Sequence, residues 1–229
     1  MAAPASSSAA YTALVVGSTG AVGRELIAEL VASTKCGKVI ALARREIPEE
    51  QWSTAFPRVD VDAAKLKLQV RAVDFDALSE KAIPPTEHVD AAFCCLGTTR
   101  KDAGSAEAFR KVDLEYVTRF GELAKAAGIP YMGLLTATNA NKNSWFLYPQ
   151  TKGEAEDNIT KLAFPRTGIF RPGLLNRGEL ARSVEKIGLY FIPSITATAV
   201  AKGMVADFET EGSTPGVKAW SHNDLKQFE

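Results

Sequence analysis

A turn of three glycines between an apolar run and a helical pattern constrains the fold of this chain more than any other feature. Leu14–Val16 is apolar, the segment Gly17–Gly23 has the spacing G-x-x-G-x-x-G, and an amphipathic pattern follows from Val22 to Ser33. A strand that enters a helix through such a turn presents free N–H groups at the helix start, where anions bind. The pattern predicts a dinucleotide-binding βα unit, although a simple tight turn would need similar residues and the commoner spacing is G-x-G-x-x-G.

Each glycine of the turn has an expected task. Gly17 permits the sharp turn out of the strand, Gly20 lets the backbone approach a pyrophosphate, and Gly23 lets the helix pack closely on the sheet. The residues that we expect to contact the pyrophosphate are Gly17, Ser18, Thr19, Gly20, Ala21, Val22 and Gly23.

Apolar runs alternate with helical patterns along the chain, which predicts an α/β fold with a parallel sheet covered on both faces. The expected strands are Ala13–Val16, Val39–Ala43, Leu66–Val70, Ala91–Leu96, Tyr131–Leu135 and Thr167–Phe170, and the expected helices are Val22–Ser33, Ala106–Ala127 and Gly153–Leu162. The polar segment 46–64, which contains prolines, is predicted as a loop. We expect a disordered tail at 1–10 and a single Rossmann-like, doubly wound domain at 11–229, with a small C-terminal lid mostly from 174–229.

Composition excludes several classes of function. The chain has 229 residues with 27 basic and 27 acidic side chains, and no basic stripe, so nucleic acid is not an expected partner. No apolar run is long enough to span a bilayer, and the first residues lack the apolar core of a signal peptide. Only three cysteines and two distant histidines are present, which predicts a cytoplasmic protein without a metal site. The adjacent Cys94 and Cys95 are interpreted as small core residues.

The end of the second strand indicates which dinucleotide binds. Ala43-Arg44-Arg45 lies about twenty residues beyond the glycine turn, where an NAD site places an acidic residue on the ribose 2′-hydroxyl. Arginines cannot accept those hydrogen bonds, but they bind a 2′-phosphate well. Arg44 and Arg45 therefore predict NADP(H), the alternative being a solvated pair of surface charges.

Three further segments are expected to line the cofactor site. Asp74 and Phe75 follow the third strand, where the carboxylate can accept from the adenine amino group or simply cap a helix. Leu96, Gly97 and Thr98 end the fourth strand, at the edge where open α/β sheets bind ligands. Arg171, Pro172 and Gly173 follow the sixth strand and are expected beside the nicotinamide, although Pro-Gly is also a common turn.

Tyr148 and Lys152 are the predicted catalytic pair. Residues four apart share one face of a helix, and an ammonium near a phenol favours the phenolate. Tyr148 is then suited to act as a general acid and base for a carbonyl and its alcohol. Pro149 fits only the first turn of a helix, which places Tyr148 at the helix start. Thr136, twelve residues earlier, is expected to share the substrate oxygen.

Taken together, these segments resemble the extended or atypical branch of the short-chain dehydrogenase/reductase superfamily. The resemblance rests on Gly17–Gly23, Ala43–Arg45, Val73–Phe75, Phe93–Arg100, Phe146–Tyr148, Lys152–Glu154 and Phe170–Gly173. It implies NADPH binding and a Ser/Thr–Tyr–Lys set, with Lys152 also holding the nicotinamide ribose. Relatives carry Ser-Ser where this chain has Thr136-Ala137, so the hydroxyl role is expected at Thr136, with Thr138 as the substitute.

Two functions follow as expectations. The first is an NADPH-dependent carbonyl reductase acting on a small carbonyl or alcohol substrate. The second is an NADP-binding sensor or scaffold with little turnover. The sequence leaves open the substrate, a regulatory protein partner and a homodimer. A kinase-like activity is not expected, because Gly23-Arg24-Glu25 lacks the Gly-Lys-Ser/Thr ending of a phosphate-binding loop.

Overall fold

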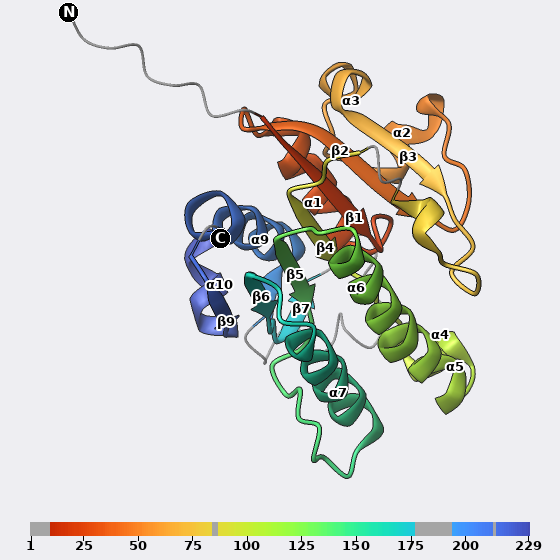
Figure 1. Ribbon diagram of the computed structural model, residues 1–229, viewed down its shortest axis with the longest axis vertical. Coiled ribbons are helices and arrows are strands. Elements are labelled where there is room, and N and C mark those ends of the chain that lie inside the picture. Colours follow the sequence, from red (N-terminus) through yellow and green to blue (C-terminus); the bar gives the residue numbers. More distant parts are fainter. Residues whose placement is uncertain (1–9, 84–86, 177–193, 213) are drawn as a thin grey trace, which may run out of the picture.

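The computed structural model describes residues 10–83, 87–176, 194–212 and 214–229. Seven strands form one parallel sheet in the order β3-β2-β1-β4-β5-β6-β9, with helices on both faces (Figure 1). The predicted single Rossmann-like α/β domain is confirmed. The predicted disorder of the N-terminal tail concerns residues that lie almost wholly outside the described ones.

The strands agree closely with the expected ones. Six of them, β1 to β6, lie within a few residues of the predicted ranges, whereas β9 and the small parallel pair β7–β8 were not predicted. The bounds are β1 (Tyr11–Val16), β2 (Cys36–Ala43), β3 (Leu68–Ala72), β4 (Ala91–Cys94), β5 (Tyr131–Leu135), β6 (Arg166–Phe170), β7 (Leu174–Asn176), β8 (Ser194–Thr196) and β9 (Gly216–Trp220).

The helices differ more from expectation. The predicted helix at 106–127 consists of α5, a π-helix at Lys111–Tyr116, and α6. The loop predicted for 46–64 is wrong in part, because this segment contains α2 and the start of α3. Asp60 caps α3 by accepting from the N–H groups of Asp62 and Ala63 at 3.0 and 3.1 Å. The bounds are α1 (Ala21–Ala32), α2 (Trp52–Ala55), α3 (Val61–Lys67), α4 (Arg100–Ala103), α5 (Ala106–Arg110), α6 (Val117–Ala126), α7 (Leu147–Lys161), α9 (Ala197–Glu211) and α10 (His222–Leu225).

Strand β1 shows how the sheet separates two hydrophobic layers. Successive side chains of a strand point to opposite faces. Ala13 and Val15 accordingly join the layer that α1 and α9 cover, while Leu14 and Val16 join the layer beneath α6 and α7. All four are fully buried, as expected for a parallel sheet covered on both faces.

The strand order reverses between β1 and β4, and this reversal fixes where a ligand can bind. On one side of the boundary the chain proceeds to β2 and β3, and on the other side to β5 and β6. The connections that leave the carboxyl ends of β1 and β4 therefore diverge to opposite faces of the sheet. The space between them is the position at which open α/β sheets bind ligands.

The C-terminal part belongs to the body of the domain more than was expected. Helix α9 packs against α1, and β9 pairs with β6 at the edge of the sheet. The expected lid at 174–229 thus contributes a helix and a strand to the main core. Residues 177–193 of that lid lie outside the described residues.

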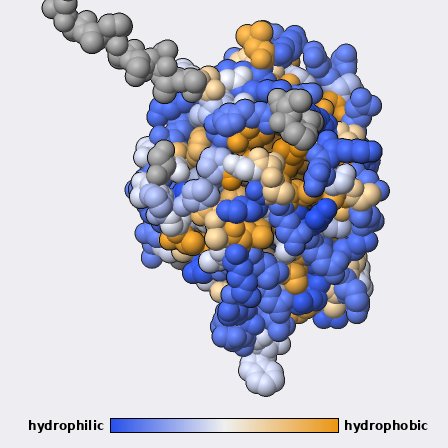
Figure 2. Space-filling model, in the orientation of Figure 1, coloured by the Kyte–Doolittle hydropathy of each residue, from blue (hydrophilic) through white to orange (hydrophobic). Residues whose placement is uncertain are grey.

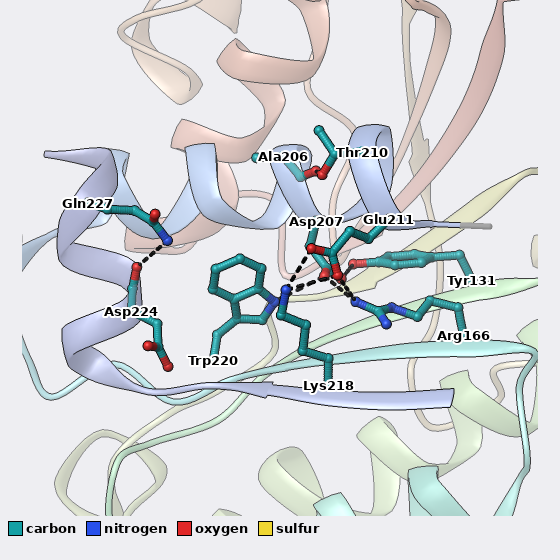
Figure 3. Close-up of polar contacts among 10 residues, drawn as sticks. All are labelled: Tyr131, Arg166, Ala206, Asp207, Thr210, Glu211, Lys218, Trp220, Asp224 and Gln227. Atoms are coloured by element: carbon teal, nitrogen blue, oxygen red, sulfur yellow. Dashed lines mark hydrogen bonds and ion pairs between the residues drawn. The ribbon is translucent and has the colours of Figure 1, made fainter. Parts of the chain in front are cut away.

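A buried carboxylate joins α9 to the sheet (Figure 3). Asp207 of α9 has no exposed surface and accepts from the Tyr131 hydroxyl at 2.7 Å, from Arg166 Nη2 at 2.6 Å and from Trp220 Nε1 at 3.0 Å. These donors come from β5, β6 and β9. One side chain therefore connects α9 with three strands, and its charge is balanced by Arg166.

The surface is mostly hydrophilic. Figure 2 shows hydrophilic residues over most of one face, with hydrophobic residues gathered towards its centre. Among the described residues, Trp145 and Phe146 are the most exposed large aromatic side chains. Within the described part of the chain, no helix has the length and apolar character that crossing a membrane requires.

Replacing Asp207 by asparagine is expected to lower the free energy of unfolding by about 3 kcal/mol, because the buried guanidinium of Arg166 then keeps only the partly exposed Glu211, at 3.2 Å, as an ionic partner. The matched control is Asp62→Asn, since the Asp62 side chain is 94% exposed and pairs only with Lys65 at 3.3 Å. That control should change the free energy by less than about 0.5 kcal/mol. Urea unfolding measures both, and equal losses in the two variants would contradict the assignment.

Candidate functional site

The glycine turn brings the end of β1 against the end of β4. Gly17 has φ +74°, and a Cβ there would lie 2.5 Å from the carbonyl carbon of Cys95. A Cβ at Gly23 would lie 2.1 Å from the Gly17 carbonyl oxygen, so α1 packs directly on the turn. Gly20 precedes α1 and offers no side chain to cap its N–H groups. The start of α1 therefore has the free donors and positive dipole end that bind an anion.

A cavity of about 900 Å³ opens at this reversal of strand order. Its wall combines residues that follow β1, β2, β3 and β4 with residues from α4, α5 and the π-helix. The predicted cofactor residues on the wall are Gly17, Ser18, Thr19, Gly20, Arg44, Asp74, Phe75, Leu96, Gly97 and Thr98. Residues that sequence reasoning missed are Leu42, Ala43, Ala72, Val73, Asp76, Cys95, Asp102, Ala103, Ala108, Val112 and Tyr116.

A second cavity of about 400 Å³ adjoins the first and shares Thr19, Ala43 and Arg44 with it. Arg45 lines only this smaller cavity. Both arginines are exposed, and within the described residues neither forms an ion pair. Two guanidinium groups at the end of β2, with the carboxylate of Glu46 beside them in the smaller cavity, could bind a phosphate.

Helix α7 carries three functional side chains on one face. Tyr148, Lys152 and Glu156 are spaced four apart, and α7 begins at Leu147, so Tyr148 lies in its first turn as predicted. Tyr148 is 40% exposed, whereas Lys152 and Glu156 are buried. The Tyr148 ring stacks on Phe109 of α5, with centroids 5.8 Å apart. Glu156 was not predicted, although its spacing from the Tyr–Lys pair places it on the same face.

Lys152 forms a buried ion pair with Asp113, which the sequence reasoning missed. Lys152 Nζ lies 2.7 Å from Asp113 Oδ1, and both side chains are almost inaccessible to solvent. Asp113 Oδ2 accepts from the Thr98 N–H at 2.8 Å. Burial by itself would lower the pKa of Lys152, but the opposite charge of Asp113 raises it above its usual value. Lys152 is therefore an ammonium in the folded protein.

Gly97 separates this ion pair from the cavity. A Cβ at Gly97 would lie 3.4 Å from Lys152 Nζ and 3.6 Å from Asp113 Oδ1. Gly97 itself lines the cavity. Lys152 and Tyr148 themselves are not among the residues that line the cavity, so Gly97 is what lies between the ammonium and that space.

The hydroxyl of Thr136 is already engaged. Thr136 is buried, and its Oγ1 donates to Glu156 Oε1 at 2.6 Å. Glu156 in turn receives two hydrogen bonds from Arg171, from Nε at 2.9 Å and from Nη2 at 2.6 Å. Thr138, two residues later, is exposed. The structure therefore uses Thr136 to join β5, α7 and the end of β6, and leaves the hydroxyl of Thr138 accessible.

The segment Arg171–Gly173 is fixed along its whole length. The Arg171 N–H donates to the Trp220 carbonyl at 2.9 Å, and the Pro172 carbonyl accepts from the Thr138 N–H at 2.9 Å. The Gly173 N–H donates to His222 Nδ1 at 3.0 Å. Arg171, Pro172 and Gly173 do not line either described cavity, but this turn positions the backbone of Thr138.

The two adjacent cysteines have different neighbours. Cys94 ends β4 in the layer beneath α6 and α7, while Cys95 belongs to the opposite layer and reaches the cavity wall. Burial raises the pKa of the Cys94 thiol to about 12, and burial likewise raises the pKa of Cys95. Both are neutral thiols at physiological pH, in agreement with the core interpretation.

Comparisons with solved structures agree with this fold. MoeE5 in complex with UDP-glucose and NAD is 15% identical and superposes with a TM-score of 0.68 over 92% of this chain and 75% of that chain. The terminal R domain from the myxalamid PKS-NRPS biosynthetic pathway is 17% identical, with a TM-score of 0.71 over 93% and 66%. These structures share with this chain a Rossmann-like α/β fold.

Curated relatives define the family. Rat HTATIP2 is 39% identical over 161 residues, which are 70% of this chain and 61% of the relative. FMP52 of Debaryomyces hansenii is 30% identical over an alignment of 231 positions that covers 93% of this chain and 96% of the relative. The chain therefore belongs to the family of HTATIP2 and FMP52. No family model matches the chain.

The expected cytoplasmic location is wrong. FMP52 relatives from Debaryomyces hansenii, Scheffersomyces stipitis and Candida albicans are named mitochondrial proteins, which points to mitochondria. The expectation rested on the small number of cysteines, and that number indicates only that the fold does not depend on disulfides. It does not distinguish one reducing compartment from another.

Replacing Gly17 by alanine is expected to destabilise the protein more than Gly128→Ala does. Both glycines have similar φ angles, +74° and +75°, so both alanines incur the same backbone strain of about 1–2 kcal/mol. Only the Cβ at residue 17 also collides with backbone, at Cys95, whereas nothing lies within 4 Å of one at residue 128. Urea unfolding measures the difference, and equal destabilisation would contradict the close approach.

Proposed function

We propose that the protein is an NADPH-dependent oxidoreductase that reduces the carbonyl group of a small molecule. The observation that carries this proposal is the position of Tyr148 and Lys152 on one face of α7, with Lys152 Nζ behind Gly97 at the cavity wall. A phenol and an ammonium in this arrangement provide acid–base chemistry beside a cavity that has the features of a dinucleotide site.

The residues present fit a nicotinamide dinucleotide. The start of α1 offers uncapped N–H groups to a pyrophosphate, and Asp74 offers a carboxylate on the cavity wall to an adenine amino group. Arg44 and Arg45 provide positive charge where a 2′-phosphate would lie. The cofactor, when bound, supplies the hydride.

The chain's own residues supply the proton. As hydride adds to the carbonyl carbon, the Tyr148 hydroxyl donates its proton to the carbonyl oxygen, which becomes the alcohol. The remaining phenolate is stabilised by the Lys152 ammonium until solvent returns a proton, and the 40% exposure of Tyr148 gives that solvent access. We also assign to Lys152 the hydrogen bond to the nicotinamide ribose that the family resemblance implies.

For the hydroxyl that shares the substrate oxygen, the geometry favours Thr138 over Thr136. The proton of Thr136 is directed to Glu156, a charged and buried acceptor, so a substrate would have to break that hydrogen bond. Thr138 is exposed, and its backbone N–H is held by Pro172. We therefore assign the substrate contact to Thr138 and a positioning role to Thr136.

Cofactor preference is tested by replacing Arg44 and Arg45 together by alanine. We expect NADPH affinity to fall by about tenfold or more, since each charged hydrogen bond contributes about 1.5–3 kcal/mol, while NADH affinity stays nearly unchanged. Calorimetry with both cofactors measures the difference. Lys226→Ala is the control for loss of an exposed positive charge on a segment that lines neither cavity. Equal losses for NADPH and NADH would contradict the 2′-phosphate assignment.

Tyr148→Phe is expected to abolish reduction of a panel of carbonyl compounds while NADPH binding survives, because only the transferable proton is removed. NADPH consumption and calorimetry measure these two properties. Thr138→Val should reduce turnover by about a hundredfold or more, the scale of positioned acid–base and hydrogen-bond assistance. Turnover that persists in Tyr148→Phe would contradict the proton-donor role. NADPH binding without turnover in the unmodified protein would favour the sensor function.

A further inference from the structure

The helix formed by α5, the π-helix and α6 faces the Tyr–Lys face of α7 with a matching pair of side chains. Phe109 and Asp113 are four residues apart, as are Tyr148 and Lys152. Phe109 stacks on Tyr148, and Asp113 pairs with Lys152. Each member of the proposed catalytic pair thus has one partner on the same neighbouring helix.

The backbone around Asp113 is unusual. Asp113 lies within the π-helix Lys111–Tyr116, which interrupts what the sequence predicts as a continuous α-helix. Such interruptions are rare and occur frequently at functional sites. Asp113 also accepts from the Thr98 N–H, so one carboxylate holds both the lysine and the chain segment that follows β4 at the cavity.

We propose that Asp113 is a positioning residue that keeps Lys152 protonated and directed at the cofactor cavity. A buried lysine without a counter-charge loses its proton readily, because burial disfavours the ammonium. The other groups that face Lys152 are Tyr148 on its own helix and the thiols of Cys94 and Cys95 from the end of β4. Those thiols are neutral near pH 7, so Asp113 is the counter-charge that the described residues provide.

The benefit of this role to catalysis rests on the proposed function, but the effect of Asp113 on the charge of Lys152 does not. The charge state of Lys152 is a property of the protein without cofactor or substrate. It can therefore be measured whether or not the protein turns over a carbonyl compound.

The test is an NMR titration of the lysine side chains in the full chain, with the Lys152 signal assigned through Lys152→Met. In Asp113→Asn, Lys152 should lose its proton at a pH at least about one unit lower than in the unmodified protein. Asp113→Glu retains the carboxylate and should restore most of the difference. If Asp113→Asn does not fold, Asp113→Ser takes its place, since its smaller side chain leaves room for water beside the ammonium.

Asp207→Asn is the matched control, because Asp207 is an equally buried carboxylate in an ion pair remote from Lys152. It should lower stability without moving the Lys152 titration. The proposal is overturned if Lys152 titrates at the same pH in Asp113→Asn as in the unmodified protein, or if Asp207→Asn moves it equally. Where turnover is measurable, Asp113→Asn should also move the alkaline limb of the pH–activity profile to lower pH, which a purely structural role would not do.

Discussion

The close approach of the β1 and β4 ends is the constraint on which the rest of the site depends. Gly17 can contact the Cys95 backbone only because it lacks a side chain and adopts a positive φ. This contact closes the bottom of the cavity at the reversal of strand order, and Gly23 then brings α1 onto the same turn. The anion-binding start of α1, the Cys95–Thr98 segment and the Asp113–Lys152 ion pair are all positioned from it.

Two buried ion pairs and a third whose arginine is partly exposed connect elements of the domain, and their places in the fold separate their roles. Arg166–Asp207 joins α9 to three strands and lies in the layer away from the cavity, so it serves the fold. Glu156–Arg171 joins α7 to the end of β6, and Lys152–Asp113 joins α7 to the π-helix behind the cavity wall. A buried pair is costly to desolvate and seldom improves stability over apolar packing. The buried Lys152–Asp113 pair on the helix that carries Tyr148 is therefore better explained by the orientation of α7, to which the Glu156–Arg171 pair also contributes.

Local signals in the sequence predicted strands β1 to β6, the glycine turn, the arginines after β2 and the Tyr–Lys spacing. Each of these depends on residues close together in the chain. What was missed depends on partners far apart: Asp113 is recognisable only once it lies against Lys152, and Glu156 only once it meets Thr136 and Arg171. Strand β9 was missed because an exposed edge strand such as Gly216–Trp220 lacks the continuous apolar run of the central strands. The sequence likewise does not show that the Thr136 hydroxyl binds Glu156, because the two residues are 20 positions apart.

The burial of the three side chains on α7 increases along the helix, and this gradient suits the different requirements of Tyr148 and Lys152. Tyr148 at the start of the helix is 40% exposed, whereas Lys152 one turn further and Glu156 two turns further are buried. Proton exchange with solvent requires access at the phenol, while a fixed ammonium requires exclusion of water around its ion pair. A single helix that runs from the surface into the core satisfies both requirements. A substrate for Tyr148 would therefore approach from the solvent side of α7, and the cofactor from the side of Gly97.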